Sequence, residues 1–181
     1  MLINCLYFLY VFVRETEQLS TLIAQAKAHD ILFIYAISPG LDICYSNPKE
    51  VAALKRKLDQ VRQLGNPAFA LLFDDIEPEL SEADKEMFNS FASAQVSITN
   101  EVYRHLGQPS FLFCPTEYCS SRAVPSVPHS EYLSTIGAKL DPEIDIMWTG
   151  TRVISQTIRL VQIQELTEVL RRKPVIWDNL H

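Results

Sequence analysis

Residues 69–76 read FALLFDDI, five apolar side chains followed at once by two carboxylates. A short run rich in aromatic and branched residues is typical of a buried β-strand. Four further runs resemble it, and the five together cover residues 31–37, 69–73, 111–114, 144–148 and 174–177. Their starts are separated by 38, 42, 33 and 30 residues, which leaves room for a helix and two loops between consecutive strands. The spacing therefore predicts an α/β fold in which parallel strands alternate with helices.

Apolar residues at helical spacing predict the helices between these strands. In residues 19–26, and again in residues 51–61, they recur every three or four positions. Each of these two segments therefore forms its own apolar stripe, which can cover a sheet. Asn47 and Pro48 suit the start of the second of these helices. Ser81, with Asp84 three residues later, predicts the start of a further, continuous helix that runs to Gly107. Shorter helices are expected over residues 130–140 and 161–172.

Composition limits the classes of function. The chain has 181 residues, of which 48% are hydrophobic, so it fits one globular domain or part of a larger one. Lys and Arg number 16 against 22 Asp and Glu, which gives a net charge of −6 and no basic field for nucleic acid or an anionic membrane. The four cysteines are too sparse for a disulfide scaffold, and a reducing, intracellular setting fits them best.

The N-terminal residues form an atypical apolar segment. Residues 2–13, LINCLYFLYVFV, are fewer than the roughly 20 residues needed to cross a bilayer, so no stable membrane insertion is expected. A cleaved signal, a buried strand and an atypical, truncated N-terminus are the alternatives for this segment. We therefore divide the chain into this segment, residues 1–16, and the α/β region, residues 17–181.

Polar or aromatic residues follow each predicted strand. Because the carboxyl ends of parallel strands meet on one face, these residues predict one concave mouth where a ligand binds. Helix caps and turns explain Ser38, Gly40 and Gly150 equally well, and a tryptophan at a strand end can also belong to the core. The five groups are Ser38-Pro39-Gly40, Asp74-Asp75, Thr116-Glu117-Tyr118, Trp148-Thr149-Gly150 and Trp177-Asp178-Asn179.

The Asp74-Asp75 pair carries the clearest chemical signal. Two carboxylates held close together repel, which raises the pKa of one and leaves it able to donate a proton near neutral pH. Glycosidic cleavage needs this division between one acid and one anion. Trp148 and Trp177 could pack against a sugar ring. A metal-dependent hydrolase, with Asp74, Asp75, Asp178 and His181 as ligands, is the alternative.

Six stretches of the sequence closely resemble the catalytic domain of the O-GlcNAcases, glycoside hydrolase family 84. They are FIYAISPGLDI (33–43), SNPKEV (46–51), FALLFDDI (69–76), FLFCPTEYC (111–119), WTG (148–150) and PVIWDN (174–179). The resemblance implies a partial (β/α)8 TIM barrel of about five βα units, the third to the seventh strands of the family barrel. It also implies removal of N-acetylglucosamine from Ser and Thr of cytoplasmic and nuclear proteins, without a cofactor.

The same resemblance implies a role for individual residues. The mechanism is retaining, and the acetamido oxygen of the substrate is the nucleophile, an exception to the usual pair of carboxylates. Asp74 would orient and polarise the acetamide, and Asp75 would be the general acid and then the general base. Tyr118 would bind at the reacting centre, and Trp177 and Asn179 would line the sugar pocket. Gly40 and Cys114 would lie near that pocket without an assigned role.

Parts of the family pattern have no counterpart in this sequence. They are the first two strands, with a sugar-binding glycine and lysine, and an aspartate and the last strand that would follow His181. The loop at residues 120–128 also differs from that of the family. We therefore expect an excerpt of a barrel with two open sheet edges, which favour homo-oligomers, and little or no activity. A non-catalytic, truncated product is the alternative to an active enzyme.

Overall fold

Five parallel strands form one sheet in the computed structural model, which describes residues 13–40, 42–74, 76 and 79–179. Their order in the sheet is the same as their order in the sequence, and every neighbouring pair is parallel. This arrangement confirms the predicted alternation of strands and helices. The strands are β1 (Ile34–Ile37), β2 (Ala68–Leu72), β3 (Ser110–Cys114), β4 (Asp145–Trp148) and β5 (Val175–Ile176).

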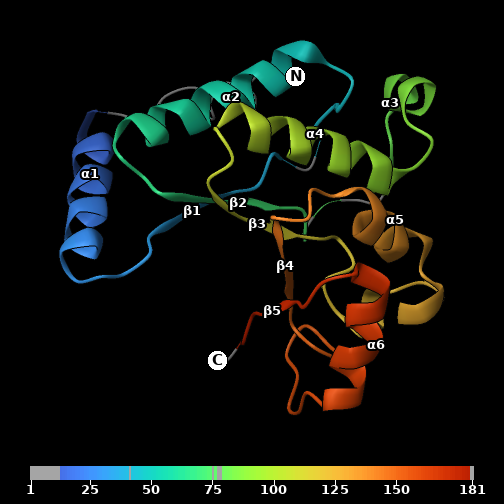
Figure 1. Cartoon of the computed structure of the whole chain (residues 1–181). Helices are drawn as coiled ribbons and strands as arrows, with labels where there is room; N and C mark the ends of the chain where they lie inside the picture. The colour runs from blue at the N-terminus through green and yellow to red at the C-terminus, as the bar shows by residue number, and fades with distance from the viewer. Residues whose placement is uncertain (1–12, 41, 75, 77–78, 180–181) are drawn as a thin grey trace.

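Helices connect these strands and cover one face of the curved sheet. Figure 1 shows α2, α4, α5 and α6 following one another around its outer side, with α1 beside β1 at one end. In the described part of the chain, none of the helices is long and apolar enough to cross a membrane. The helices are α1 (Val13–Ala28), α2 (Pro48–Gln63), α3 (Glu82–Met87), α4 (Phe91–His105), α5 (Glu131–Lys139) and α6 (Leu160–Leu170), with 3-10 turns at Ser120–Arg122 and Val127–His129.

The prediction of one continuous helix from Ser81 to Gly107 is wrong, because the chain breaks into α3 and α4. Phe88 has extended backbone angles (φ −119°, ψ 132°), and a helix cannot continue through such a residue. The Ser81 hydroxyl oxygen accepts a hydrogen bond from the Asp84 amide at 3.1 Å, and the Ser90 hydroxyl oxygen accepts one from the Ser93 amide at 3.1 Å. Each short helix therefore begins at its own serine cap.

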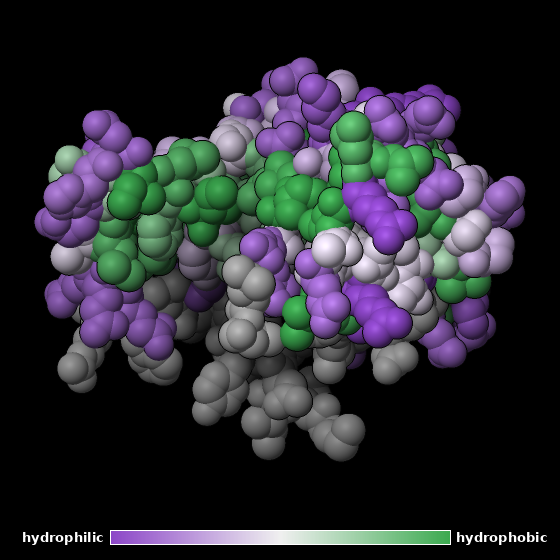
Figure 2. Space-filling model, turned by 90° about the horizontal axis from the view of Figure 1, so that it is seen from below, coloured by the Kyte–Doolittle hydropathy of each residue, from purple (hydrophilic) through white to green (hydrophobic). Residues whose placement is uncertain are grey.

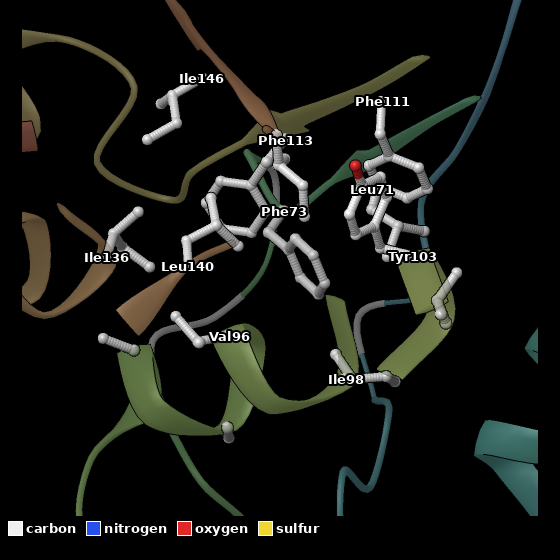
Figure 3. Packing of buried hydrophobic residues seen from close by; sticks show 14 of the residues in the cluster. Leu71, Phe73, Val96, Ile98, Tyr103, Phe111, Phe113, Ile136, Leu140 and Ile146 are labelled. Carbon is white, nitrogen blue, oxygen red and sulfur yellow. The ribbon is translucent and has the colours of Figure 1, made fainter. Parts of the chain in front are cut away.

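The main core lies between the sheet and the outer helices. Phe73 from the end of β2 and Phe113 from β3 have ring centroids 5.5 Å apart, and both rings are fully buried. Figure 3 shows these rings pointing toward Val96 and Ile98 of α4, with Ile146 of β4 on the same side of the sheet. The alternate residues of each strand thus anchor the sheet to its helices.

A second, smaller cluster of buried residues lies on the face of the sheet opposite the helices. Cys114, Tyr118 and Cys119 are its buried members, and Leu72, Met147 and Trp177 pack against them. Leu72 and Met147 alternate with the helix-facing residues of β2 and β4, so the cluster belongs to the inner side of the sheet. It collects residues from the carboxyl ends of four neighbouring strands, β2 to β5.

Candidate active site

The carboxyl ends of β2 and β3 are held in register by the ladder of the sheet. Leu72 pairs with Cys114, and the Phe73 amide donates to the Cys114 carbonyl oxygen at 2.9 Å. Asp74 follows immediately and is half-buried in the turn that ends the strand. Its predicted partner, Asp75, lies outside the residues that the structure describes. A carboxylate at this position stands at the edge of the sheet where ligands bind in parallel α/β folds.

Backbone hydrogen bonds join the loops that follow β3, β4 and β5. The Thr149 amide donates to the Tyr118 carbonyl oxygen at 2.9 Å, and the Trp177 amide donates to the Trp148 carbonyl oxygen at 2.9 Å. The Ser120 amide donates to the Gly150 carbonyl oxygen at 2.9 Å. The ends of β3, β4 and β5, three of the five that the sequence predicted to converge, are therefore fixed to one another by their backbone.

Tyr118 and Trp177 form the aromatic part of this edge. Their ring centroids are 6.4 Å apart with the planes inclined at 41°, and both residues contact the cluster around Cys114. The Arg122 guanidinium lies 4.7 Å from the centre of the Tyr118 ring, within the range of a cation–π interaction. The sequence analysis missed Arg122, which lies in the loop that differs from the family pattern.

Asn179 and Gly40 lie at the two ends of the predicted mouth. The Asn179 side-chain amide donates to the Val153 carbonyl oxygen at 3.3 Å, which ties the end of β5 to the loop after β4. Gly40 follows β1 and has φ of +106°, a region where residues with a side chain are strained. The backbone conformation by itself therefore accounts for glycine at this position.

Trp148 is placed apart from the other aromatic residues of the predicted mouth. It is 2% exposed and belongs to the main core, on the same side of β4 as Ile146. Its ring therefore faces the helices, whereas Met147, on the other side of the strand, packs against the cluster that contains Tyr118 and that Trp177 also contacts. The structure gives Trp148 a packing role under the mouth, not a place beside Tyr118.

Two polar neighbours of Tyr118 connect its loop to the rest of the fold. The Ser130 hydroxyl donates to Glu117 at 2.5 Å, and burial raises the pKa of the Glu117 carboxyl above its ordinary value. The Thr116 hydroxyl donates to the Phe73 carbonyl oxygen at 2.6 Å and accepts a hydrogen bond from Gln95 at 3.0 Å. Gln95 and Thr99 are polar residues on the mainly apolar buried stripe of α4, and this departure from the pattern was a signal in the sequence.

A surface hollow of about 280 Å³ lies in the helical layer between α2 and α4. Val51 and Ala52 contribute to its apolar wall, and Lys55 and Glu101, joined at 2.6 Å, stand at its polar side. Most of the lining comes from α2, α3 and α4, on the helical side of the sheet, so this hollow is separate from the predicted mouth. No group of three or more His, Cys, Asp or Glu residues in the described ranges is arranged to hold a metal ion.

Comparisons with known proteins agree on one family. The sequence matches the family model described as beta-N-acetylglucosaminidase over residues 10–181. Protein O-GlcNAcase of Rattus norvegicus is 60% identical to this chain over 170 residues, and that of Mus musculus is 59% identical over 170 residues. Each alignment covers 93% of this chain and 19% of the relative, so the chain spans about a fifth of these curated relatives.

A solved structure supports the same relationship. The match is to a mutant O-GlcNAc hydrolase of Thermobaculum terrenum, with a TM-score of 0.88 and 31% sequence identity. The superposition covers 96% of this chain and 37% of the other. The five parallel strands and their outer helices thus match part of that hydrolase, in agreement with the expected partial barrel.

Proposed function

Because the chain belongs to the beta-N-acetylglucosaminidase family, we propose that it carries part of an active site that removes O-linked N-acetylglucosamine from Ser and Thr of proteins. The observation that carries the proposal is the family match over residues 10–181, within which Asp74 lies two residues after the end of β2. The rat and mouse relatives named Protein O-GlcNAcase support this substrate class. We propose cytoplasmic and nuclear glycoproteins as the substrates.

The proposed reaction proceeds in two steps with retention at the anomeric carbon. The acetamido oxygen of the substrate forms a bond to that carbon while the bond to the Ser or Thr oxygen breaks, and Asp75 gives its proton to the departing oxygen. Asp75 then removes a proton from water, which attacks the same carbon and releases the acetamido oxygen. Each step inverts the configuration, so the product retains it. No metal or cofactor takes part in this scheme.

Asp74 supports the first step through the acetamide. As a carboxylate it accepts a hydrogen bond from the acetamide N–H, which increases the electron density on the attacking oxygen. Tyr118 and Trp177, which lie together in the inner cluster, would bind the reacting centre and the face of the sugar. Asn179 would bind sugar hydroxyls, Gly40 and Cys114 would lie at the margin of the pocket, and Trp148 would support it from the core.

We also propose that residues 1–181 alone turn over substrate slowly. Trp177 and Asn179 are partly exposed, and the neighbouring Val175 and Ile176 are 37% and 43% exposed, so water reaches this side of the site. Hydrogen bonds to the transition state are weaker in a wet site, and the sugar is positioned less firmly. The site therefore needs more of the barrel to work at full rate.

The experiment places residues 17–181 in the equivalent part of the rat relative and measures turnover of two N-acetylglucosaminides. One has an activated aryl leaving group, and the other has an alkyl or peptide leaving group. Asp75→Asn should slow the second substrate far more than the first, by about 10²-fold or more, because an activated leaving group needs little protonation. Asp74→Asn should slow both substrates, because both require attack by the acetamide.

Two controls sharpen this experiment. Asp42→Asn removes a carboxyl group after β1 to which the proposal gives no role, and it should leave both rates close to those of the parent. A chelator should not reduce either rate, whereas a metal-dependent hydrolase would lose its activity. Equal losses on the two substrates in both Asp74→Asn and Asp75→Asn would refute the roles assigned to this pair.

A further inference from the structure

Four hydrogen bonds join the peptide group that precedes Asp74 to α4 and α5. The Thr116 hydroxyl donates to the Phe73 carbonyl oxygen at 2.6 Å, and the Gln95 side-chain amide donates to the Thr116 hydroxyl at 3.0 Å. The Tyr132 hydroxyl donates to the Gln95 carbonyl oxygen, and the Thr116 backbone amide donates to the Tyr132 hydroxyl at 2.9 Å. We propose that Thr116, oriented by Gln95 and Tyr132, is a positioning residue that fixes where Asp74 leaves the sheet.

The direction of every bond in this network is determined by its two backbone ends. A backbone amide can only donate and a backbone carbonyl can only accept. The Thr116 hydroxyl must therefore give its proton to Phe73, so it accepts from the NH₂ group of Gln95. The carbonyl oxygen of Gln95 then faces Tyr132, whose hydroxyl donates to it and accepts from the Thr116 amide. One arrangement of protons satisfies all four groups, and the network holds a single geometry.

The network fixes the backbone that carries Asp74. The Phe73 amide is held by Cys114 at 2.9 Å, and the Phe73 carbonyl oxygen is held by Thr116, so the peptide groups on both sides of Phe73 are fixed. The second peptide group is planar and includes the Cα atom of Asp74. Thr116 thus places the first atom of the residue whose carboxylate acts on the acetamide, an inference that rests on the proposed function. Displacements of about 1 Å in such a group can cost about 10²-fold in rate.

The groups of this network are buried, so they contribute to folding as well as to the position of Asp74. Gln95 is fully buried, and Thr116 is 7% exposed. The network ends on two backbone groups, the Phe73 carbonyl and the Thr116 amide, so it also stabilises the fold by keeping these groups paired. A contribution to folding and an effect on Asp74 are therefore both expected, and a test must separate them.

The test measures the side chain of Asp74 directly in the 181-residue chain. The signal of its carboxyl carbon is assigned with Asp74→Asn and followed by NMR as a function of pH. Thr116→Val removes the hydroxyl and should shift the apparent pKa of Asp74 by roughly half a unit or more, since carboxyl pKa values in proteins vary by about one unit with their surroundings. Thr116→Ser keeps the hydroxyl and should restore the parent value.

Thr99→Val is the matched control. Thr99 is also fully buried, and its hydroxyl donates to the Gln95 backbone carbonyl oxygen at 2.7 Å within α4, so its loss leaves the four bonds intact. This variant should lower the melting temperature and leave the titration of Asp74 unchanged. An unchanged titration in Thr116→Val, or an equal shift in Thr99→Val, would overturn the proposal.

A second variant covers the case in which Thr116→Val does not fold. Tyr132→Phe then replaces it, because it keeps Thr116 and removes only the hydroxyl that orients Gln95. A shift in the titration of Asp74 supports the proposal and an unchanged titration refutes it. These measurements need no turnover. Loss of the proposed glycosidase function would appear separately, as normal activity of Asp74→Asn in the rat hybrid.

Discussion

Glu117 is the residue beside Tyr118 whose charge depends on burial. Burial is the largest influence and raises the pKa of its carboxyl above 4.5, although hydrogen bonds from the Ser130 hydroxyl and the Val124 backbone amide oppose it. In the pH range between 4.5 and the raised pKa, the folded chain holds a proton that the unfolded chain has lost. Because the folded state binds more protons there, the stability contributed by Glu117 falls as pH rises through this range.

Glu117→Gln should remove this pH dependence. Glutamine cannot ionise, and its side-chain oxygen can still accept a hydrogen bond from Ser130. The free energy of unfolding of the variant, minus that of the parent, should therefore increase as pH rises from below 4.5 to neutral, as denaturant titrations at each pH would measure. Glu131→Gln, the same change at an exposed carboxyl, is the control. A difference that stays constant or decreases with pH would contradict the role of burial.

Single residues also show how far the sequence could predict the site. Alternation along β4 places Trp148 with Ile146 and opposite Met147, so the helix-facing direction of its ring was available from strand periodicity. The sequence analysis used only its place at a strand end. Trp177 lies beyond β5, where alternation no longer applies, and it packs against Tyr118. Predictions for residues beyond a strand end depend on loop contacts that the sequence does not specify.

The boundaries of the helices were also predictable at some positions and not at others. Asn47 and Pro48 predicted the start of α2, and the Asn47 side-chain oxygen accepts from the Lys49 amide at 3.0 Å. The break between α3 and α4 was missed because the apolar spacing continues through Phe88 and Phe91, as it would in one helix. Ser90 is the cap that starts α4, but a serine inside an apolar pattern is compatible with either structure. A capping residue therefore predicted a helix start where no apolar pattern ran through it, as at Asn47, and not where the pattern continued, as at Ser90.

The contact between α5 and α6 supports a prediction at the scale of elements. A Cβ atom at Gly137 would lie 2.3 Å from the Val169 carbonyl oxygen and 2.8 Å from the Leu170 Cα atom. Both are backbone atoms, so α6 as a whole would have to move. Alanine favours a helix over glycine by about 1 kcal/mol, but overpacking at a close contact costs about 1–3 kcal/mol or more. The packing cost should prevail.

Gly137→Ala should therefore lower the free energy of unfolding by roughly 1–2 kcal/mol, as denaturant titration would measure. Ser97→Ala is the control for helix propensity alone, since Ser97 is exposed on α4, and its effect should stay within about 0.5 kcal/mol of the parent. Equal or greater stability of Gly137→Ala would mean that α5 and α6 do not approach as closely as the structure indicates.

At the scale of the whole molecule, helices cover the outer side of the sheet, and apolar side chains reach the surface at its ends. Ile31 and Leu32, just before β1, are 62% and 56% exposed, and Val175 and Ile176 of β5 are 37% and 43% exposed. Figure 2 views the molecule from below and shows apolar residues at the surface from one end of the molecule to its middle. Among the described strands, β1 pairs only with β2, and β5 pairs only with β4. Exposed strand edges with apolar side chains favour pairing with another chain.

We expect the 181-residue chain to self-associate through these edges. Sedimentation velocity at increasing protein concentration should detect species larger than the monomer of 20.6 kDa. Ile34→Lys in β1 and Val175→Lys in β5 should each reduce that association, because a charged side chain on an edge strand is costly to bury against a second strand. The double variant should reduce it further if both edges take part.

Met87→Lys is the matched control for the added charge. Met87 is 63% exposed at the end of α3, in the helical layer, so the change in net charge is the same while the edges of the sheet stay as they are. The net charge moves from −6 to −5 in each single variant, which by itself should increase association slightly because repulsion between copies falls. A decrease in Ile34→Lys or Val175→Lys therefore cannot come from net charge. A monomer at all concentrations in the parent, or an equal decrease in Met87→Lys, would show that the edges do not drive association.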